Sequence, residues 1–166
     1  MPERISIFGL GNVGQALLRS FARVRGGPAL VLVADSKGAF LGENLDPMDV
    51  LKRKERGDYD RPRAAGDAET LLRLSKTEIH VELTPTNLED GQPAVGDIEA
   101  ALSLGVPVVT AAKSHQRSRE TLAHVLERAG ETPFLDHAAT LAGIPATEMV
   151  AGIGFQLTRI KGVLNG

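Results

Sequence analysis

Short apolar runs alternate along the chain with segments in which apolar residues recur at helical spacing. The runs predict strands at residues 5–8, 30–34, 79–83 and 106–110, one starting at 134, and a last one at 160–164. The run 30–34 is apolar on both faces, as expected for a central strand of a parallel sheet. The alternation predicts an α/β fold, with crossover helices covering a doubly wound, mainly parallel sheet.

Five helices are predicted between these strands. The first carries its apolar residues in one buried stripe, made up of Val13, Ala16, Leu17, Phe21 and Val24. The second is short and runs from its N-cap Asp46 to Leu51. Asp67 caps the third helix, and Gly105 and Gly130 end the fourth and fifth. The apolar faces of these last three hold Leu71, Leu72 and Leu74, then Ile98, Ala101 and Leu102, then Leu122, Val125, Leu126 and Ala129.

Composition and charge exclude several classes of protein. The 166 residues, of which 42% are hydrophobic, suffice for one domain with its own core. Lys and Arg number 19 against 21 Asp and Glu, so the net charge of −2 offers no attraction to nucleic acid or an anionic membrane. There is no Cys, which excludes disulfides and thiolate chemistry. No apolar run reaches membrane-spanning length and no signal peptide precedes the first strand, so we expect a cytoplasmic protein.

A glycine pattern of the form G-x-G-x-x-G lies between the first predicted strand and the first helix. It consists of Gly9, Gly11 and Gly14, with Asn12 and Val13 completing the turn into the helix. The first glycine permits a tight turn, the second leaves no side chain between backbone and ligand, and the third lets helix and strand pack closely. Free N–H groups at the helix N-terminus can then hold a pyrophosphate. The context predicts a Rossmann-type dinucleotide-binding domain; the alternative is a glycine-rich turn with a structural role alone.

The end of the second predicted strand bears on which dinucleotide binds. Asp35 follows the glycines at the distance of a ribose-binding carboxylate, with Ser36 and Lys37 beside it. A carboxylate there accepts from the 2′-hydroxyl of NAD and repels the 2′-phosphate of NADP, which favours NAD. Lys37 and the run 52–54 could offset that repulsion. However, we interpret 52–63 as a charged surface loop, in which the run 52–54 would face solvent. NAD is therefore favoured, and the choice between NAD and NADP remains open.

Two further segments follow strands where ligands bind in this architecture. Thr84, Pro85 and Thr86 are candidates for lining a nicotinamide. Thr110, Ala111 and Lys113 follow the next strand, and a lysine there can present its ammonium to a substrate oxygen that gains charge. Lys113 as a merely exposed loop residue is the alternative. No metal is assigned, because the four histidines, His80, His115, His124 and His137, show no ligand spacing with carboxylates, and the adjacent Ser114 and His115 form no catalytic dyad.

Taken in order, these blocks are similar to the nucleotide-binding domain of homoserine dehydrogenase. The matching strings are IFGLGNVG, ADSKGA, VELTPTN, ALSLGVPVVTAAK, AGIP and IKGVLNG, and they span nearly the whole chain. The resemblance implies a cytoplasmic, dimeric enzyme of amino-acid biosynthesis from aspartate, on the path to threonine and methionine. That enzyme interconverts homoserine and aspartate semialdehyde with NAD or NADP. It also implies a catalytic role for Lys113, which matches the lysine of the family's T-A-N-K motif.

The chain departs from the family pattern at three places. Ala112 stands where the family usually has Asn, and residues 137–140 read HAAT where the family has a segment linked to a monovalent cation, so that ion is not carried over. The family's substrate domain follows the point at which this sequence stops. We therefore take 1–166 as the NAD(P)-binding domain, with 146–166 as the start of a connection to a substrate and dimerisation domain.

Three functions stay open on the sequence alone. The first is the cofactor domain of homoserine dehydrogenase, with the small-molecule substrate bound mainly outside this chain. The second is a non-catalytic dinucleotide-binding module that senses redox state or regulates a partner. The third is a dehydrogenase for another amino-acid semialdehyde or small carbonyl. A homodimer is expected, because apolar residues after Ile144 would otherwise lose cover.

Overall fold

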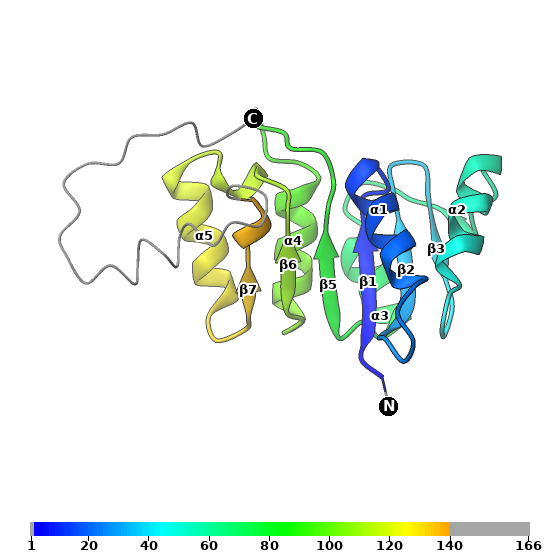
Figure 1. Cartoon of the computed structure of the whole chain (residues 1–166). Helices are drawn as coiled ribbons and strands as arrows, with labels where there is room; N and C mark the ends of the chain where they lie inside the picture. Colours follow the sequence, from blue (N-terminus) through cyan, green and yellow to red (C-terminus); the bar gives the residue numbers. More distant parts are fainter. Residues whose placement is uncertain (1, 140–166) are drawn as a thin grey trace, which may run out of the picture.

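The computed structural model describes residues 2–139, which form one seven-stranded mixed sheet between two layers of helices (Figure 1). The strands are β1 (Arg4–Phe8), β2 (Ala29–Ala34), β3 (Gly38–Leu41), β4 (Arg61–Pro62), β5 (Ile79–Glu82), β6 (Val108–Thr110) and β7 (Phe134–Leu135). The helices are α1 (Asn12–Phe21), α2 (Pro47–Arg56), α3 (Ala68–Ser75), α4 (Ala94–Ser103) and α5 (Arg119–Ala129), with short 3₁₀ turns η1 (Ser114–Gln116) and η2 (His137–Ala139).

The strand order is β4-β3-β2-β1-β5-β6-β7. Strands β2, β1, β5, β6 and β7 run parallel, and β3 and β4 add an antiparallel edge. The chain passes from β1 outward to β2 and later returns to the other side of β1 as β5. The order of strands therefore reverses at β1, and a ligand crevice is expected above the carboxyl ends of β1 and β5. The predicted doubly wound α/β fold is confirmed.

Two hydrophobic cores hold the layers together, one on each face of the sheet. On the face covered by α1 and α2, Ile7 and Val33 pack with Leu18, Val50 and other buried apolar residues. On the opposite face, β1 and β2 pack against α3, α4 and α5. Every residue of β2 is buried, as its unbroken apolar run predicted. The two cores fix the sheet as a rigid platform beneath the loops at its carboxyl edge.

The structure corrects the sequence prediction between β2 and α3. Residues 52–56 continue α2, which ends at Gly57 in the left-handed conformation, so the prediction of a surface loop from residue 52 is wrong there. Only Val50 and Leu51 are buried in this charged helix, which gives a weak periodic signal. Strands β3 and β4 were also not predicted, because such short strands at a sheet edge carry too few alternating residues.

The first helix is rotated only in part relative to its predicted stripe, of which Leu17 and Phe21 pack against the core as expected. Gly14 and Leu18 face the sheet, whereas Val13 and Val24 are 57% and 59% exposed, and Val24 lies beyond the helix end. The close contact of Gly14 with the turn before the helix sets this rotation. Leu74 and Leu126, also predicted to be buried, are exposed.

Several predicted helix boundaries are confirmed. The Asp46 carboxylate accepts the Asp49 N–H at 2.7 Å, as an N-cap does, and Gly105 follows α4 in the left-handed conformation. Asp67 precedes α3 without capping it through its side chain. The predicted strand at 160–164 lies outside the described residues. Over 2–139, no helix is long and apolar enough to cross a membrane.

Candidate functional site

The three glycines of the G-x-G-x-x-G pattern, which we call the glycine fingerprint, have different packing requirements. A Cβ on Gly9 would lie 2.3 Å from the Leu83 carbonyl carbon, and one on Gly14 would lie 2.0 Å from the Gly9 carbonyl oxygen. Gly9 also has a φ of +97°, which disfavours any residue with a side chain. By contrast, a Cβ on Gly11 would meet nothing within 4 Å. Packing therefore explains Gly9 and Gly14 and leaves Gly11 without a packing reason.

The N-terminus of α1 opens beside Gly11. The first backbone hydrogen bond of the helix runs from Gln15 N–H to the Gly11 carbonyl at 3.0 Å, so the N–H groups of residues 12–14 have no partner within the helix. The first turn contains no acidic residue that would oppose an anion. Together with the helix dipole, these N–H groups can hold a negatively charged group.

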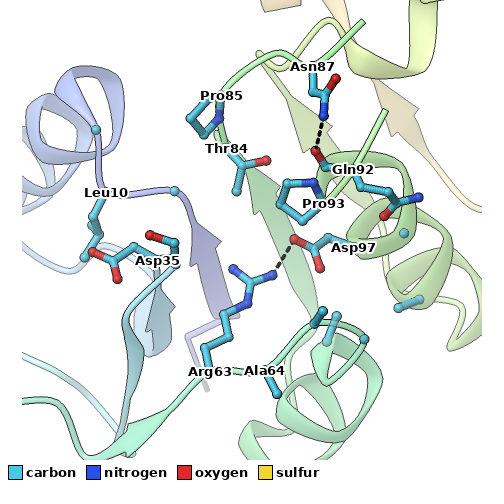
Figure 2. Close-up of a pocket in the computed structure, with 18 of the residues that line it drawn as sticks. Leu10, Asp35, Arg63, Ala64, Thr84, Pro85, Asn87, Gln92, Pro93 and Asp97 are labelled. Atoms are coloured by element: carbon cyan, nitrogen blue, oxygen red, sulfur yellow. Dashed lines mark hydrogen bonds and ion pairs between the residues drawn. The ribbon is translucent and has the colours of Figure 1, made fainter. Parts of the chain in front are cut away.

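A cavity of about 810 Å³ lies above the carboxyl ends of β1, β2 and β5 (Figure 2). Asp35 stands on one side and Thr84 and Pro85 on the other, while the Arg63–Asp97 ion pair crosses the wall between α3 and α4. The volume lies within the range of small-molecule sites. The lining residues are Gly9, Leu10, Gly11, Asp35, Ser36, Lys54, Arg63, Ala64, Ala65, Gly66, Ala68, Thr84, Pro85, Thr86, Asn87, Gln92, Pro93, Gly96, Asp97 and Ala100.

A second, smaller cavity of about 260 Å³ continues from the first past the start of α1. The two share Gly11 and residues 84–86. The residues that line the smaller cavity are Gly11, Asn12, Val13, Leu83, Thr84, Pro85, Thr86, Ala111 and Ala112. The fingerprint turn therefore separates a large space on the Asp35 side from a smaller one on the β6 side.

Asp35 is surrounded by hydrogen-bond donors from this chain. Its Oδ1 accepts the Lys37 N–H at 2.8 Å, and its Oδ2 accepts from Lys54 Nζ at 2.5 Å and Tyr59 Oη at 2.9 Å. Burial by itself would raise the pKa of Asp35, but the bonds from Lys54, Lys37 and Tyr59 outweigh it and lower that pKa. Burial and the bond to Asp35 raise the pKa of Tyr59 to about 12, which keeps this phenol a donor. The carboxylate thus stays charged, with its oxygens already occupied.

Lys54 belongs to the cavity, contrary to its interpretation as a surface charge. Helix α2 brings its ammonium to Asp35, where only 23% of the Lys54 side chain is exposed. Lys52, two residues earlier on the same helix, is exposed and lines neither cavity. Had 52–56 been interpreted as a helix, Lys52 and Lys54 would have been placed on different sides of it, because residues two apart do not share a helix face.

The wall between α3 and α4 contains a buried ion pair. The side chains of Arg63 and Asp97 are 8% and 5% exposed, and the guanidinium also lies 4.1 Å from the centroid of the Phe8 ring. Burial and, to a smaller extent, the nearby Glu82 raise the pKa of Asp97 to about 6, although Arg63 opposes the shift. Neither residue was predicted to belong to the site, because they are distant in the sequence and match no motif.

Hydrogen bonds join the loops that follow β5 and β6. The Lys113 N–H donates to Thr86 Oγ1 at 3.1 Å, and the Asn87 N–H donates to Ser114 Oγ at 2.9 Å. Lys113 is half-buried, and within 2–139 its ammonium has no hydrogen-bond or ion-pair partner. It follows directly after Ala112, which lines the smaller cavity. The ammonium is therefore available to a group from outside the described residues.

The structure gathers most of the predicted site residues around the two cavities, and four do not line them. Gly14 packs under Gly9, the Lys37 backbone holds Asp35, and Lys113 lies just beyond the smaller cavity. Thr110 is buried and donates its hydroxyl to the Glu82 carbonyl at 3.1 Å. Among the described residues, no three His, Asp or Glu side chains are grouped as a metal site.

No protein-family profile matches the sequence. No curated protein sequence matches it either.

Solved structures do match. The homoserine dehydrogenase of Thermoplasma acidophilum gives a TM-score of 0.72 at 25% identity over 90% of this chain and 47% of that one. A hyperthermophilic archaeal homoserine dehydrogenase in complex with NADPH gives 0.69 at 24% identity, over 90% of this chain and 48% of that one. A leucine-bound, hetero-hexameric glutamate dehydrogenase of Thermus thermophilus gives 0.56 at 26% identity, over 86% and 31%.

This chain thus spans about half the length of these two homoserine dehydrogenases. The part of those enzymes that matches this chain is consistent with their nucleotide-binding domain alone. The resemblance to homoserine dehydrogenase, predicted from short motifs, is confirmed at the level of the fold.

Proposed function

We propose that this chain is the NAD(P)-binding domain of an oxidoreductase. The observation that carries the proposal is Gly11: its missing side chain leaves open space in both cavities, beside the unpaired N–H groups that begin α1. A pyrophosphate fits this place because the backbone can approach it and the helix end attracts negative charge. The bound nicotinamide would supply the chemistry, by giving or accepting a hydride.

The two cavities suit the two halves of a dinucleotide. The larger one has a wall of small residues at 64–66, together with Asp35 and Lys54 at one end, which suits an adenosine. The smaller one lies toward Thr86 and Ala112 and suits a nicotinamide. The pyrophosphate would then lie at Gly11, which both cavities share.

We further propose that NADP is accepted at least as readily as NAD. The case for NAD depended on an Asp35 carboxylate free to accept from a ribose hydroxyl. Both of its oxygens already accept hydrogen bonds, and the Lys54 ammonium offsets its charge. A 2′-phosphate would therefore meet a cation together with the carboxylate rather than an isolated negative charge. The NADPH complex of a structural neighbour is in line with this preference.

The full enzyme is proposed to be a homoserine dehydrogenase, on the resemblance in motifs and fold. Lys113 would hold a proton at Nζ and stabilise negative charge on the substrate oxygen. The described residues offer no paired site for an amino group and a carboxylate beside Lys113. We therefore expect these 166 residues to bind cofactor without oxidising homoserine, because hydride transfer depends on the reacting carbon being held in place.

The test is NADPH formation from homoserine and NADP⁺ at alkaline pH, by this chain and by the full-length protein that its gene encodes. The full-length protein should be active, and Lys113→Ala should lower its turnover by a factor of about 100 or more with little change in cofactor affinity. Robust turnover by the 166 residues alone would show that the substrate site lies within this chain. Full activity in Lys113→Ala would make this lysine an ordinary loop residue.

A non-catalytic module that senses the redox state of a dinucleotide is the second candidate. The loop from 84 to 87 and the β6 loop, joined by hydrogen bonds, would then transmit binding of the reduced or oxidised cofactor. Such a module should bind the two redox forms with different affinities and show no homoserine-dependent turnover in the full-length protein. The glutamate dehydrogenase match also leaves room for another amino-acid substrate, which the same assay with alternative substrates would reveal.

A further inference from the structure

A row of buried polar side chains lies beneath the junction of the two cavities. Ser6 on β1 faces His80 on β5, and Ser6 Oγ is 2.9 Å from His80 Nδ1. His80 Nε2 is in turn 3.4 Å from Glu82 Oε2, and all three side chains are fully buried. Buried polar groups cost free energy unless they are hydrogen-bonded, so an apolar row would serve the core at least as well. Packing of the core therefore does not explain why these three side chains are polar.

The row ends at a carboxylate that directs the hydroxyl of Thr84. Glu82 Oε1 accepts the backbone N–H of Thr84 at 2.8 Å and also contacts Thr84 Oγ1. The side-chain bond runs from the Thr84 hydroxyl to Oε1, because an ionised carboxylate oxygen only accepts, so Oε1 accepts both protons. A hydroxyl has one proton and two lone pairs. Thr84 Oγ1 can therefore offer only lone pairs to any further partner.

Thr84 lies on the wall of both cavities, where a bound ligand would meet a hydroxyl that can only accept. It lines both cavities, next to Pro85 on the wall seen in Figure 2, and it is 7% exposed. The edge of His80 packs against the Phe8 ring at 4.6 Å between centroids, and the Thr110 hydroxyl holds the Glu82 carbonyl. His80 thus contacts the carboxylate at Oε2 and Thr84 at Oε1, while Thr110 holds the backbone of Glu82.

We propose that Glu82 is a positioning residue that makes Thr84 a hydrogen-bond acceptor for an N–H or O–H group of the bound dinucleotide. The inference rests on the proposed cofactor binding and deepens it. The carboxamide N–H₂ of nicotinamide and the ribose hydroxyls are such donors. Phosphate oxygens are acceptors only, so they would find no partner in this hydroxyl.

Calorimetric titration with NADP⁺ tests the proposal in four variants. Thr84→Val keeps the shape and removes the acceptor, so affinity should fall by about five- to tenfold, the usual worth of one hydrogen bond. Thr84→Ser keeps the hydroxyl and should bind within about twofold of the parent. Glu82→Gln retains an acceptor oxygen and should also bind well. Glu82→Leu removes the acceptor, frees the hydroxyl proton and should weaken binding like Thr84→Val.

A second ligand identifies the donor. The 3-acetylpyridine analogue of NADP⁺ replaces the carboxamide N–H₂ by a methyl group. If Thr84 accepts from the carboxamide, the parent and Thr84→Val should bind this analogue equally. If it accepts from a ribose hydroxyl, Thr84→Val should lose affinity for both ligands.

Two results would overturn the proposal. One is a Thr84→Val protein that binds NADP⁺ as tightly as the parent. The other is tighter binding by a folded Glu82→Leu protein, since that would mean that the freed hydroxyl donates to the ligand. If Glu82→Leu does not fold, the comparison of Thr84→Val with Thr84→Ser still decides. Failure of the parent to bind any nicotinamide dinucleotide would instead refute the proposed function.

Discussion

At the scale of single residues, we predict that the charge of Lys54 influences the choice between NADP and NAD, because its ammonium contacts the Asp35 carboxylate. Lys54→Met removes the ammonium and leaves the Asp35 carboxylate to face a 2′-phosphate alone. Affinity for NADPH relative to NADH should therefore fall by about tenfold or more, the worth of one charge-assisted hydrogen bond. Competitive titration with the two cofactors measures the ratio. Lys52→Met removes the same charge from the exposed side of α2 and is the matched control.

An unchanged ratio in Lys54→Met would show that the ammonium serves only to hold Asp35. In that case, the ratio should respond to Asp35→Ser, which removes the carboxylate and leaves the lysine. If Asp35→Ser improved NADPH binding, repulsion by the carboxylate would be the dominant effect. NAD would then be the expected cofactor of this site.

Asp97 makes the stability of the domain depend on pH. Its raised pKa, about 6, means that the folded chain binds this proton more tightly than the unfolded chain does. Ionised Asp97 therefore destabilises the fold progressively as pH rises from about 4 to above 6. Asp97→Asn keeps an acceptor for Arg63 and removes the titration. Relative to the parent, its free energy of unfolding should rise by on the order of 2 kcal/mol between about pH 4.5 and 7.5.

Asp136 supplies a control of opposite sign. A hydrogen bond from His115 lowers the pKa of its carboxyl despite partial burial, so Asp136 stabilises the fold above its unfolded pKa. That contribution is lost as pH falls through the lowered value. Urea unfolding of Asp136→Asn should show a deficit that is full at neutral pH and shrinks in acid. A pH-independent difference between Asp97→Asn and the parent would contradict the proposed burial of a charged Asp97.

Motifs located some of the site's residues and could not locate others. Gly11, Asp35 and Thr84 each follow a strand, at the edge of the sheet where ligands bind in this fold, so local patterns predict their place. Arg63, in the loop after β4, meets Asp97 on α4 through a tertiary contact that no local pattern encodes. Sequence patterns also predicted that Asp35 follows the second strand, where it lines the larger cavity, without indicating that its oxygens accept bonds from this chain.

At the scale of elements, the turn before α1 fixes the angle of that helix. A methyl group on Gly14 would collide with the Gly9 carbonyl at 2.0 Å, and backbone cannot yield as a side chain does. Gly14→Ala should therefore destabilise the domain by about 2–3 kcal/mol. Gly11→Ala, whose methyl meets open space, should change stability by less than about 1 kcal/mol. Thermal or urea unfolding of the two variants makes the comparison.

Equal stabilities for the two variants would mean that α1 shifts easily and that Gly14 has no packing role. Gly27→Ala serves as a further control, since its added methyl group would make only ordinary contact with Val24 at 3.4 Å. The same packing explains why apolar periodicity described the buried side of α1 only in part, with Leu17 and Phe21 against the core and Val13 exposed. A glycine carries no hydrophobic signal, yet Gly14 marks the side of the helix that approaches the sheet most closely.

Elements with strong local signals were predicted well, and those that depend on their neighbours were not. The buried strand β2 and the glycine end of α4 follow from local sequence alone. The antiparallel strand β3 pairs with β2 through only three residue pairs, Leu32 with Leu41, Val33 with Phe40 and Ala34 with Ala39. Such a strand is stabilised by the edge it joins rather than by its own pattern.

At the scale of the whole molecule, the reversal of strand order at β1 brings the fingerprint turn, the Asp35 loop and the β5 loop together around one crevice. Short motifs predicted that meeting because a doubly wound sheet places the carboxyl ends of its strands on one edge. The homodimer, the cytoplasmic location and the substrate domain that the sequence led us to expect stay predictions. This arrangement of loops supports the proposed cofactor binding.

Titration of the 166-residue chain with NADPH and NADH, followed by calorimetry, tests cofactor binding most directly. The parent should bind at least one of them at one site per chain. Gly11→Val places a branched side chain in the open space shared by both cavities, so affinity should fall by about a hundredfold or more, while the unfolding transition stays cooperative. Equal affinities for Gly11→Val and the parent, or no binding of either cofactor by the folded parent, would contradict the account.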